Sequence, residues 1–177
     1  MCWMCDAPKY PYIKDNNTEV NRLIDNDEKC YAIVPTDPVF RHHIMIVHKE
    51  HRDNFIYFNS SDVAQMGNMM SKWCRVFKLM KYDTVYTGCF SDSGHAHFHL
   101  YPFHFKTEKI DKGCALQWLA SKEHLAGENM FKNLQKDKEA LKKDEEKYKE
   151  TVKKIDERIE MIKEIVKELL KYKMRVS

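Results

Sequence analysis

The sequence predicts an α+β fold in which short strands surround one helix and a long C-terminal helix is appended. Three observations predict it. Histidines alternate with apolar residues over residues 94–102, as in a strand with one chemical and one buried face. Short β-branched runs at 30–35 and 43–47 are typical of further strands. Apolar residues recur at steps of three and four over 61–80 and 131–169, which indicates helices.

The composition of the 177 residues predicts one globular core with an appendage. The formal net charge of +3 is uneven, because residues 122–177 hold 16 Lys/Arg against 13 Asp/Glu and the remainder holds 14 of each. A neutral globular part argues against nucleic-acid binding. There is no apolar run near 18 residues and no basic-then-apolar leader. We therefore expect a cytoplasmic protein without a membrane partner, although a nuclear location is compatible.

The first third of the chain is expected to supply strands and turns. Residues 6–29 are rich in turn formers and polar groups, with one short segment around Val20 to Ile24 that could be helix or strand. The runs at 30–35 and 43–47 are predicted to be two strands joined by a turn, which makes a hairpin-like pair.

The next segment is expected to be a helix that ends before Asp83 and packs one apolar stripe on the core. The stripe consists of Val63, Met66, Met70, Trp73, Phe77 and Met80. Ser60 or Ser61 is predicted to cap its N-terminus. The methionines are interpreted as core filler rather than as a cofactor or partner surface. Residues 84–90 are predicted to form a strand that leads to the histidine strand.

The histidine strand is the main candidate for chemistry. Its alternating positions are His95, His97 and His99 on one face and Ala96, Phe98 and Leu100 on the other. Imidazoles spaced about 6.5 to 7 Å apart along one strand can bind a metal, transfer protons or attack an electrophile. The alternative is a solvated His-rich strand, which regular alternation with apolar partners disfavours.

The His-x-His-x-His segment, followed by two apolar residues and Pro102, resembles the motif of the histidine-triad (HIT) nucleotide hydrolases and transferases. Residues 30–38 and 43–51 are similar to the family's other signature, in which an apolar strand and an Asp-x-x-Pro-like turn precede a strand that opens with His and closes on Lys-x-His. The resemblance covers residues 1–105. It implies a HIT-like antiparallel sheet with a packed helix.

The resemblance also implies a covalent mechanism. His97 would attack the α-phosphorus of a phosphoramidate or dinucleoside polyphosphate and form a nucleotidyl-histidine that water cleaves. His99 would contact phosphoryl oxygens or protonate the leaving group. His43 matches the family's fourth active-site histidine, and it and the local backbone are candidates to fix the tautomer of His97. His42 stands where the family often has a small residue, and is expected to be a surface residue.

The loop before the triad departs from the family pattern. The predicted phosphate-binding residues are Ser91, Ser93 and Gly94. Asp92 places negative charge near an anionic substrate, and Phe103 stands where the family often has Arg. These departures keep an alternative open, namely a catalytically weak nucleotide-binding or zinc-stabilised interaction module that recruits a partner through the C-terminal helix.

An N-terminal Cys-x-x-Cys pair could take two corners of a tetrahedral zinc site. Six cysteines without a secretion signal favour reduced thiols or metal ligands over disulfides. The resemblance to zinc-containing HIT proteins and galactose-1-phosphate uridylyltransferases implies the ligands Cys2, Cys5, His51 and His95. His48 could replace His51. The alternatives are a frayed N-terminus without metal and a plain His-rich protein with metal at His97 and His99.

Residues 123–175 contain no proline and predict one long helix, about 75 Å in length. Its apolar residues fit heptad positions, weakly before Tyr148 and strongly after it, which predicts a coiled coil. We expect a homodimer formed through the HIT-like domain, the helix or both. The alternative is that the stripe packs on its own domain or on another protein. The predicted domains are 1–120 and 123–175.

Overall fold

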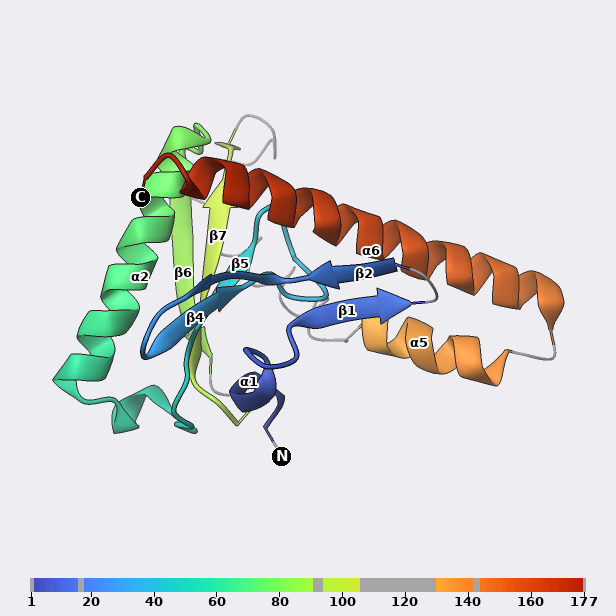
Figure 1. Cartoon of the computed structure of the whole chain (residues 1–177), viewed down its shortest axis with the longest axis horizontal. Coiled ribbons are helices and arrows are strands. Elements are labelled where there is room, and N and C mark those ends of the chain that lie inside the picture. Colours follow the sequence, from blue (N-terminus) through green and yellow to red (C-terminus); the bar gives the residue numbers. More distant parts are fainter. Residues whose placement is uncertain (1, 16–17, 91–93, 106–129, 142–143, 177) are drawn as a thin grey trace.

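The computed structural model describes residues 2–15, 18–90, 94–105, 130–141 and 144–176. Its centre is a five-stranded antiparallel sheet with the order β3-β4-β5-β7-β6 (Figure 1). The strands are β3 Leu23–Asn26, β4 Cys30–Ile33, β5 Ile44–His48, β6 Thr84–Phe90 and β7 His97–Phe103. The α+β class, the hairpin-like pair β4–β5 and the strand before the histidines are confirmed.

The register between β5 and β7 decides which side chains share a face. His97 lies opposite Val47, and His99 lies opposite Met45. Because side chains alternate along each strand, these four point to one face, which we name the histidine face. The predicted alternation is confirmed for His97 and His99. It is wrong for His95, because β7 begins only at His97.

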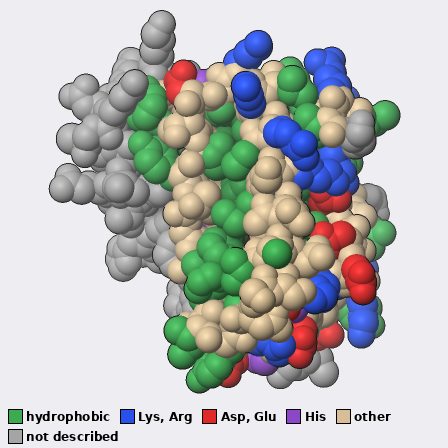
Figure 2. Space-filling view, turned by 90° about the vertical axis from the view of Figure 1, so that its left-hand side faces the viewer, with side chains coloured by type: hydrophobic (Ala, Val, Ile, Leu, Met, Phe, Trp, Pro, Cys, Tyr) green, Lys and Arg blue, Asp and Glu red, His purple; other side chains and the backbone are tan. Residues whose placement is uncertain are grey.

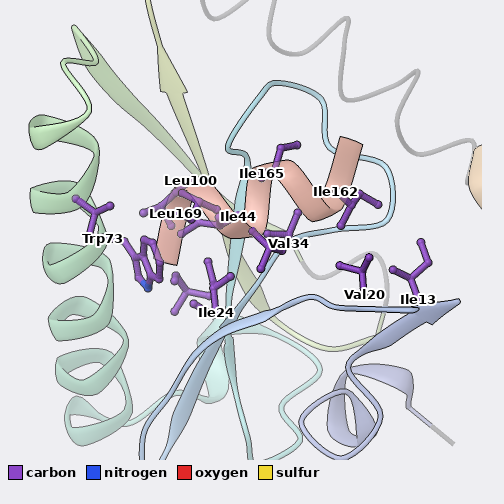
Figure 3. Close-up of a cluster of buried hydrophobic side chains, with 14 of the residues drawn as sticks. Ile13, Val20, Ile24, Val34, Ile44, Trp73, Leu100, Ile162, Ile165 and Leu169 are labelled. Carbon is purple, nitrogen blue, oxygen red and sulfur yellow. The ribbon is translucent and has the colours of Figure 1, made fainter. Parts of the chain in front are cut away.

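Two helices cover the opposite face, which we name the helix face. α2 Ser60–Leu79 contacts β4 and β5, and α6 Glu145–Lys173 crosses the sheet and reaches α2 near the C-terminus (Figure 1). Trp73 of α2, Leu169 of α6 and Leu100 of β7 belong to one buried cluster (Figure 3). Each is fully buried, so both helices and the sheet share a single core.

The predicted stripe of α2 is confirmed with a small rotation. Met66 and Trp73 are buried and Met70 is partly buried against the core, whereas Val63 is 43% exposed. The side of the molecule that carries α2 shows hydrophobic side chains among polar ones (Figure 2). The predicted serine cap is wrong. Asn59 caps the helix in a reciprocal capping box with the third helical residue, because its amide oxygen can accept from that residue's backbone N–H.

The predicted single C-terminal helix is wrong, because the described residues from 130 onward form two helices. α5 Met130–Ala140 packs against α6, and the Asp144 side chain caps α6 by accepting from the backbone N–H of Lys147. The apolar stripe of α6 packs on the chain's own core, mainly against α5, α2 and the hairpin of β1 Tyr12–Asp15 and β2 Thr18–Asn21. Ile155, Ile159 and Ile162 are fully buried there. Each such residue contributes about 1.5 to 3 kcal/mol. The coiled coil is not confirmed, and the alternative of a stripe packed on its own domain is what the structure has.

The boundary between the two predicted domains falls at residues 106–129, outside the described residues, so this division stays a prediction. Self-association stays a prediction as well. No helix within the described ranges is both long enough and apolar enough to cross a membrane.

Of the N-terminal elements, the sequence predicts only a short segment around Val20 to Ile24, where the structure has parts of the strands β2 and β3. The N-terminal elements are α1 Trp3–Asp6 and the β1–β2 hairpin, which packs on α6. A short 3-10 helix, Phe55–Tyr57, precedes α2. α1 is anchored near the histidine face, since Met4 is 2% exposed and its carbonyl accepts from the Tyr31 hydroxyl at 2.6 Å. The alternative of a frayed N-terminus is therefore wrong for residues 2–6.

Candidate active site and metal centre

His43 and His99 form a buried pair of imidazoles with fixed protons. The backbone N–H of Val39 donates to His43 Nδ1 at 3.2 Å, so His43 carries its proton on Nε2, 2.8 Å from Nδ1 of His99. His99 Nδ1 therefore accepts, and the neutral His99 ring is protonated on Nε2. Burial and the neighbouring rings of His99 and His97 hold the pKa of His43 well below its usual value. His43 is thus a neutral ring that links the backbone of Val39 to the ring of His99.

His97 has the opposite tautomer. Its Nδ1 lies 2.8 Å from the backbone oxygen of His95, and a carbonyl can only accept, so the proton is on Nδ1 and the lone pair on Nε2. Of the two predicted candidates for this task, the local backbone holds His97 and His43 holds His99. The ring centroids of His97 and His99 lie 4.7 Å apart. A nitrogen lone pair therefore lies beside a ring that donates from Nε2.

The four predicted metal ligands come together. One ligand atom from each of Cys2, Cys5, His51 and His95 lies within 4.8 Å of all the others. His95 Nδ1 is 3.3 Å from Cys2 Sγ and 3.5 Å from Cys5 Sγ, and His51 Nδ1 is 3.4 Å from Cys5 Sγ. Bond lengths to zinc give about 3.5 Å between sulfur and nitrogen at adjacent corners of a tetrahedron. Both the donor types and the separations fit one tetrahedral zinc ion.

The groups behind these ligands also suit a metal. His95 Nε2 donates to the His48 carbonyl at 2.8 Å, and His51 Nε2 lies 2.7 Å from a carboxylate oxygen of Asp53. Such bonds leave Nδ1 of each ring as the ligand nitrogen. Burial, followed by the hydrogen bond with Cys2 and the charge of Cys2, raises the pKa of Cys5 to about 11, so a nearby cation is needed to hold the Cys5 sulfur as a thiolate.

His48 does not join the cluster as the predicted substitute. Its ring Nδ1 donates to the Glu50 carbonyl at 3.2 Å, and its Nε2 lies 3.3 Å from Asp62. Its backbone contributes instead, through the bond from His95. The Ala96 N–H also donates to the Arg52 carbonyl at 2.7 Å. These two bonds draw residues 95–96 toward the segment after β5. The His95 side chain therefore joins the other three candidate metal ligands instead of continuing the alternation of β7.

The family model described as "Protein similar to CwfJ C-terminal" matches residues 1–111. The chain belongs to this family. The predicted resemblance to histidine-triad proteins is confirmed. No match was found among curated proteins.

Several solved structures resemble this chain at low sequence identity. A Zn-bound histidine triad family protein from Mycobacterium smegmatis is 18% identical with a TM-score of 0.49, and the match covers 58% of this chain and 75% of that one. A hypothetical histidine triad nucleotide-binding protein from Sulfolobus tokodaii is 20% identical with a TM-score of 0.47, covering 57% and 68%. Plasmodium falciparum diadenosine triphosphate hydrolase is 13% identical with a TM-score of 0.44, covering 52% and 69%.

The phosphate-binding residues predicted from the loop before the triad are only partly located in this member of the family. Ser91 and Ser93, like Asp92, lie outside the described residues. Gly94 is exposed and has a φ of +68°, a conformation that favours glycine. Phe103, at the position where the resemblance expects Arg, is 1% exposed and packs edge-on against Phe40 with ring centroids 5.7 Å apart. Phe103 is therefore a core residue.

The expectation that His42 is a surface residue is wrong. His42 is 5% exposed, its Nδ1 lies 2.5 Å from the Tyr82 hydroxyl, and its Nε2 contacts the Glu168 carboxylate. Its partner on α6 stands 126 residues later in the chain. Only a three-dimensional arrangement could have revealed this contact, which lies directly beside His43.

Proposed function

We propose that the protein is a nucleotide-binding hydrolase or transferase that acts on the α-phosphate of a nucleoside phosphoramidate or dinucleoside polyphosphate. The observation that carries this proposal is the pair of opposite tautomers in adjacent rings. His97 holds a lone pair on Nε2, whereas His99 holds a proton on its Nε2. A nucleophile beside a hydrogen-bond donor suits attack on an anionic phosphoryl group.

The reaction proceeds in two displacements. Nε2 of His97 attacks the α-phosphorus, a P–N bond forms, and the bond to the leaving group breaks with its electron pair. A phosphate or nucleotide departs as an anion, and an amine takes a proton from solvent. Water then attacks the nucleotidyl-histidine, the P–N bond breaks, and the water's proton passes to solvent as the nucleoside monophosphate departs. Two easier steps replace one difficult step.

The tautomers favour one of the two roles inferred for His99. Since a neutral imidazole is a very weak acid, the Nε2–H of His99 is better suited to hydrogen-bond a phosphoryl oxygen than to protonate a leaving group. His43 fixes this orientation by donating to Nδ1 of the same ring. Its lowered pKa keeps His43 in the neutral form that the arrangement requires.

The cluster of Cys2, Cys5, His51 and His95 is proposed to hold one structural zinc ion. When bound, the ion would cross-link the N-terminal segment of α1, the segment after β5 that carries His51, and His95 just before β7. The carbonyl of His95 accepts the proton of His97 Nδ1, so the same residue would serve the metal with its ring and the nucleophile with its backbone.

A second candidate function is a nucleotide-binding or interaction module with little turnover. The observation that favours it is the burial of the two histidines, because His97 is only 4% exposed and His99 only 9%. A substrate would have to reach rings that the surrounding chain covers. A module of this kind would retain nucleotide affinity without releasing product.

The deciding experiment incubates the wild type and His97→Ala with a panel of nucleoside phosphoramidates and dinucleoside polyphosphates and follows nucleoside monophosphate release. We expect release by the wild type and a loss of about a thousandfold or more in the variant, with an unchanged circular dichroism spectrum. Full activity in His97→Ala would refute the mechanism. Nucleotide binding without release by the wild type would support the second candidate.

A further inference from the structure

Glu168 of α6 holds two consecutive residues of the segment between β4 and β5. Its two carboxylate oxygens accept from Arg41, from Nη2 at 2.8 Å and from Nε at 3.2 Å, which is a two-bond pairing of carboxylate and guanidinium. One of these oxygens also contacts Nε2 of His42. Because Tyr82 lies at the other ring nitrogen, His42 bridges α6 to the segment before β6.

The backbone of His42 adopts a conformation that side chains rarely allow. Its φ is +66°, and the His43 N–H donates to the Phe40 carbonyl at 3.1 Å. His42 is therefore the third residue of a four-residue turn, where a positive φ ordinarily selects glycine or asparagine. A strained residue of this kind persists when surrounding contacts hold it. Here the contacts of its side chain are those with Glu168 and Tyr82.

The turn sets the position of the next residue, His43. The same short segment provides the Val39 N–H that fixes the His43 tautomer at 3.2 Å. From this position His43 reaches His99 at 2.8 Å. A change in the turn would alter the geometry of both hydrogen bonds, and with it the nitrogen on which His99 carries its proton.

We infer that Glu168 is a positioning residue for the active-site pair His43–His99, acting through the turn at His42. The inference rests on the proposed function for its kinetic consequence. Glu168 touches neither ring of the pair, and it lies outside residues 1–111 that match the family model. The C-terminal helix therefore does more than cover the helix face, because it sets the turn from which the catalytic chemistry is oriented.

The substitution Glu168→Gln tests this inference without detaching α6. The helix is also held by its buried isoleucines and by Lys173, whose Nζ lies 2.8 Å from Asp25. Glu164→Gln is the matched control, because Glu164 lies one turn earlier, approaches Arg41 at 3.9 Å and has no contact with His42 among the described interactions. Both variants remove one negative charge from the same face of α6.

We expect Glu168→Gln to lower kcat by about 10-fold to 100-fold, as misplacement of catalytic groups does, with KM within about twofold of wild type. Glu164→Gln should keep both constants within about twofold. Equal kcat values in the two variants would overturn the inference. If Glu168→Gln does not fold, His42→Ala replaces it. Alanine removes the contacts with Glu168 and Tyr82, keeps the unfavourable positive φ and leaves the Arg41–Glu168 pairing in place, so the same loss of kcat is expected.

Heteronuclear NMR of the imidazole nitrogens separates this inference from the proposed function. In the wild type, His43 and His99 should each give one protonated and one unprotonated nitrogen at fixed positions. In Glu168→Gln these signals should shift toward tautomer averages, whereas in Glu164→Gln they should stay. Unchanged signals in Glu168→Gln would refute the positioning role. A wild type without turnover would refute the proposed enzyme and leave the NMR comparison as the test of Glu168.

Discussion

On the histidine face, the ring of His97 is oriented by a bond to a backbone carbonyl, and the ring of His99 by a bond to a neighbouring imidazole. On the helix face, the apolar side chain of Leu169 makes no directed bond and is held by burial. Directed bonds fix which nitrogen carries a proton, and the loss of one of them alters chemistry and costs about 1 to 3 kcal/mol where a buried group stays unsatisfied. Apolar packing fixes no chemistry but supplies most of the stability. The two faces should therefore fail in different ways.

Removal of the C-terminal helices should have the largest effect. A chain that ends at residue 129 would expose the core that α5 and α6 cover, since seven large apolar residues of these helices are buried in it. These residues are Phe131, Ile155, Ile159, Ile162, Ile165, Val166 and Leu169. At about 1.5 to 3 kcal/mol each, the seven together contribute about 10 to 21 kcal/mol, which is comparable to or larger than the usual stability of a domain, about 5 to 15 kcal/mol.

We expect this shortened chain to lose its near-ultraviolet circular dichroism and its cooperative melting. A folded chain with a native spectrum would contradict the single core described here. It would instead favour the separate domain and free coiled coil that the heptad pattern predicts.

Loss of one of the four candidate metal ligands should have the next largest effect. Cys5→Ser should reduce bound zinc from about one ion per chain to a trace in elemental analysis, and should lower the melting temperature by several degrees because α1 loses its link to the segment after β5. Cys89→Ser is the control, since Cys89 is exposed on β6 and is not part of the cluster. Zinc retained in full by Cys5→Ser would exclude this ligand set.

Two adjacent leucines sharpen the comparison on the helix face. Leu169 is fully buried, whereas Leu170 is 38% exposed. Leu169→Ala should lower the free energy of unfolding by about 2 to 5 kcal/mol, and Leu170→Ala by about 0.5 kcal/mol. Urea unfolding followed by circular dichroism measures both. Equal losses would show that α6 does not pack on the sheet as described.

Sequence patterns predicted the histidine face better than the helix face, for physical reasons. The spacing of His97 and His99 is local, and strand alternation is enough to bring the two rings together. His95 leaves the strand because its ring donates to the His48 carbonyl and the next backbone N–H donates to the Arg52 carbonyl. Both carbonyls lie more than 40 residues earlier in the chain, so no local pattern encodes these bonds. The heptad pattern of α6 predicted an apolar stripe but could not say which surface would cover it.

Acidification should produce the smallest effect, and it should arise on the histidine face. Burial and the neighbouring imidazoles lower the pKa of His43 in the folded state, so below about pH 6.5 the unfolded chain binds a proton that the folded chain excludes. The stabilisation is fully present above the unfolded value and is lost as the pH falls toward the folded one, by at most about 1.4 kcal/mol per pH unit for this residue. Urea unfolding at pH 7.5 and 5.5 measures it, and His43→Asn should reduce the difference between the two. If His43→Asn keeps the whole acid sensitivity, the excluded proton belongs to another group and the neutral His43–His99 pair loses its support.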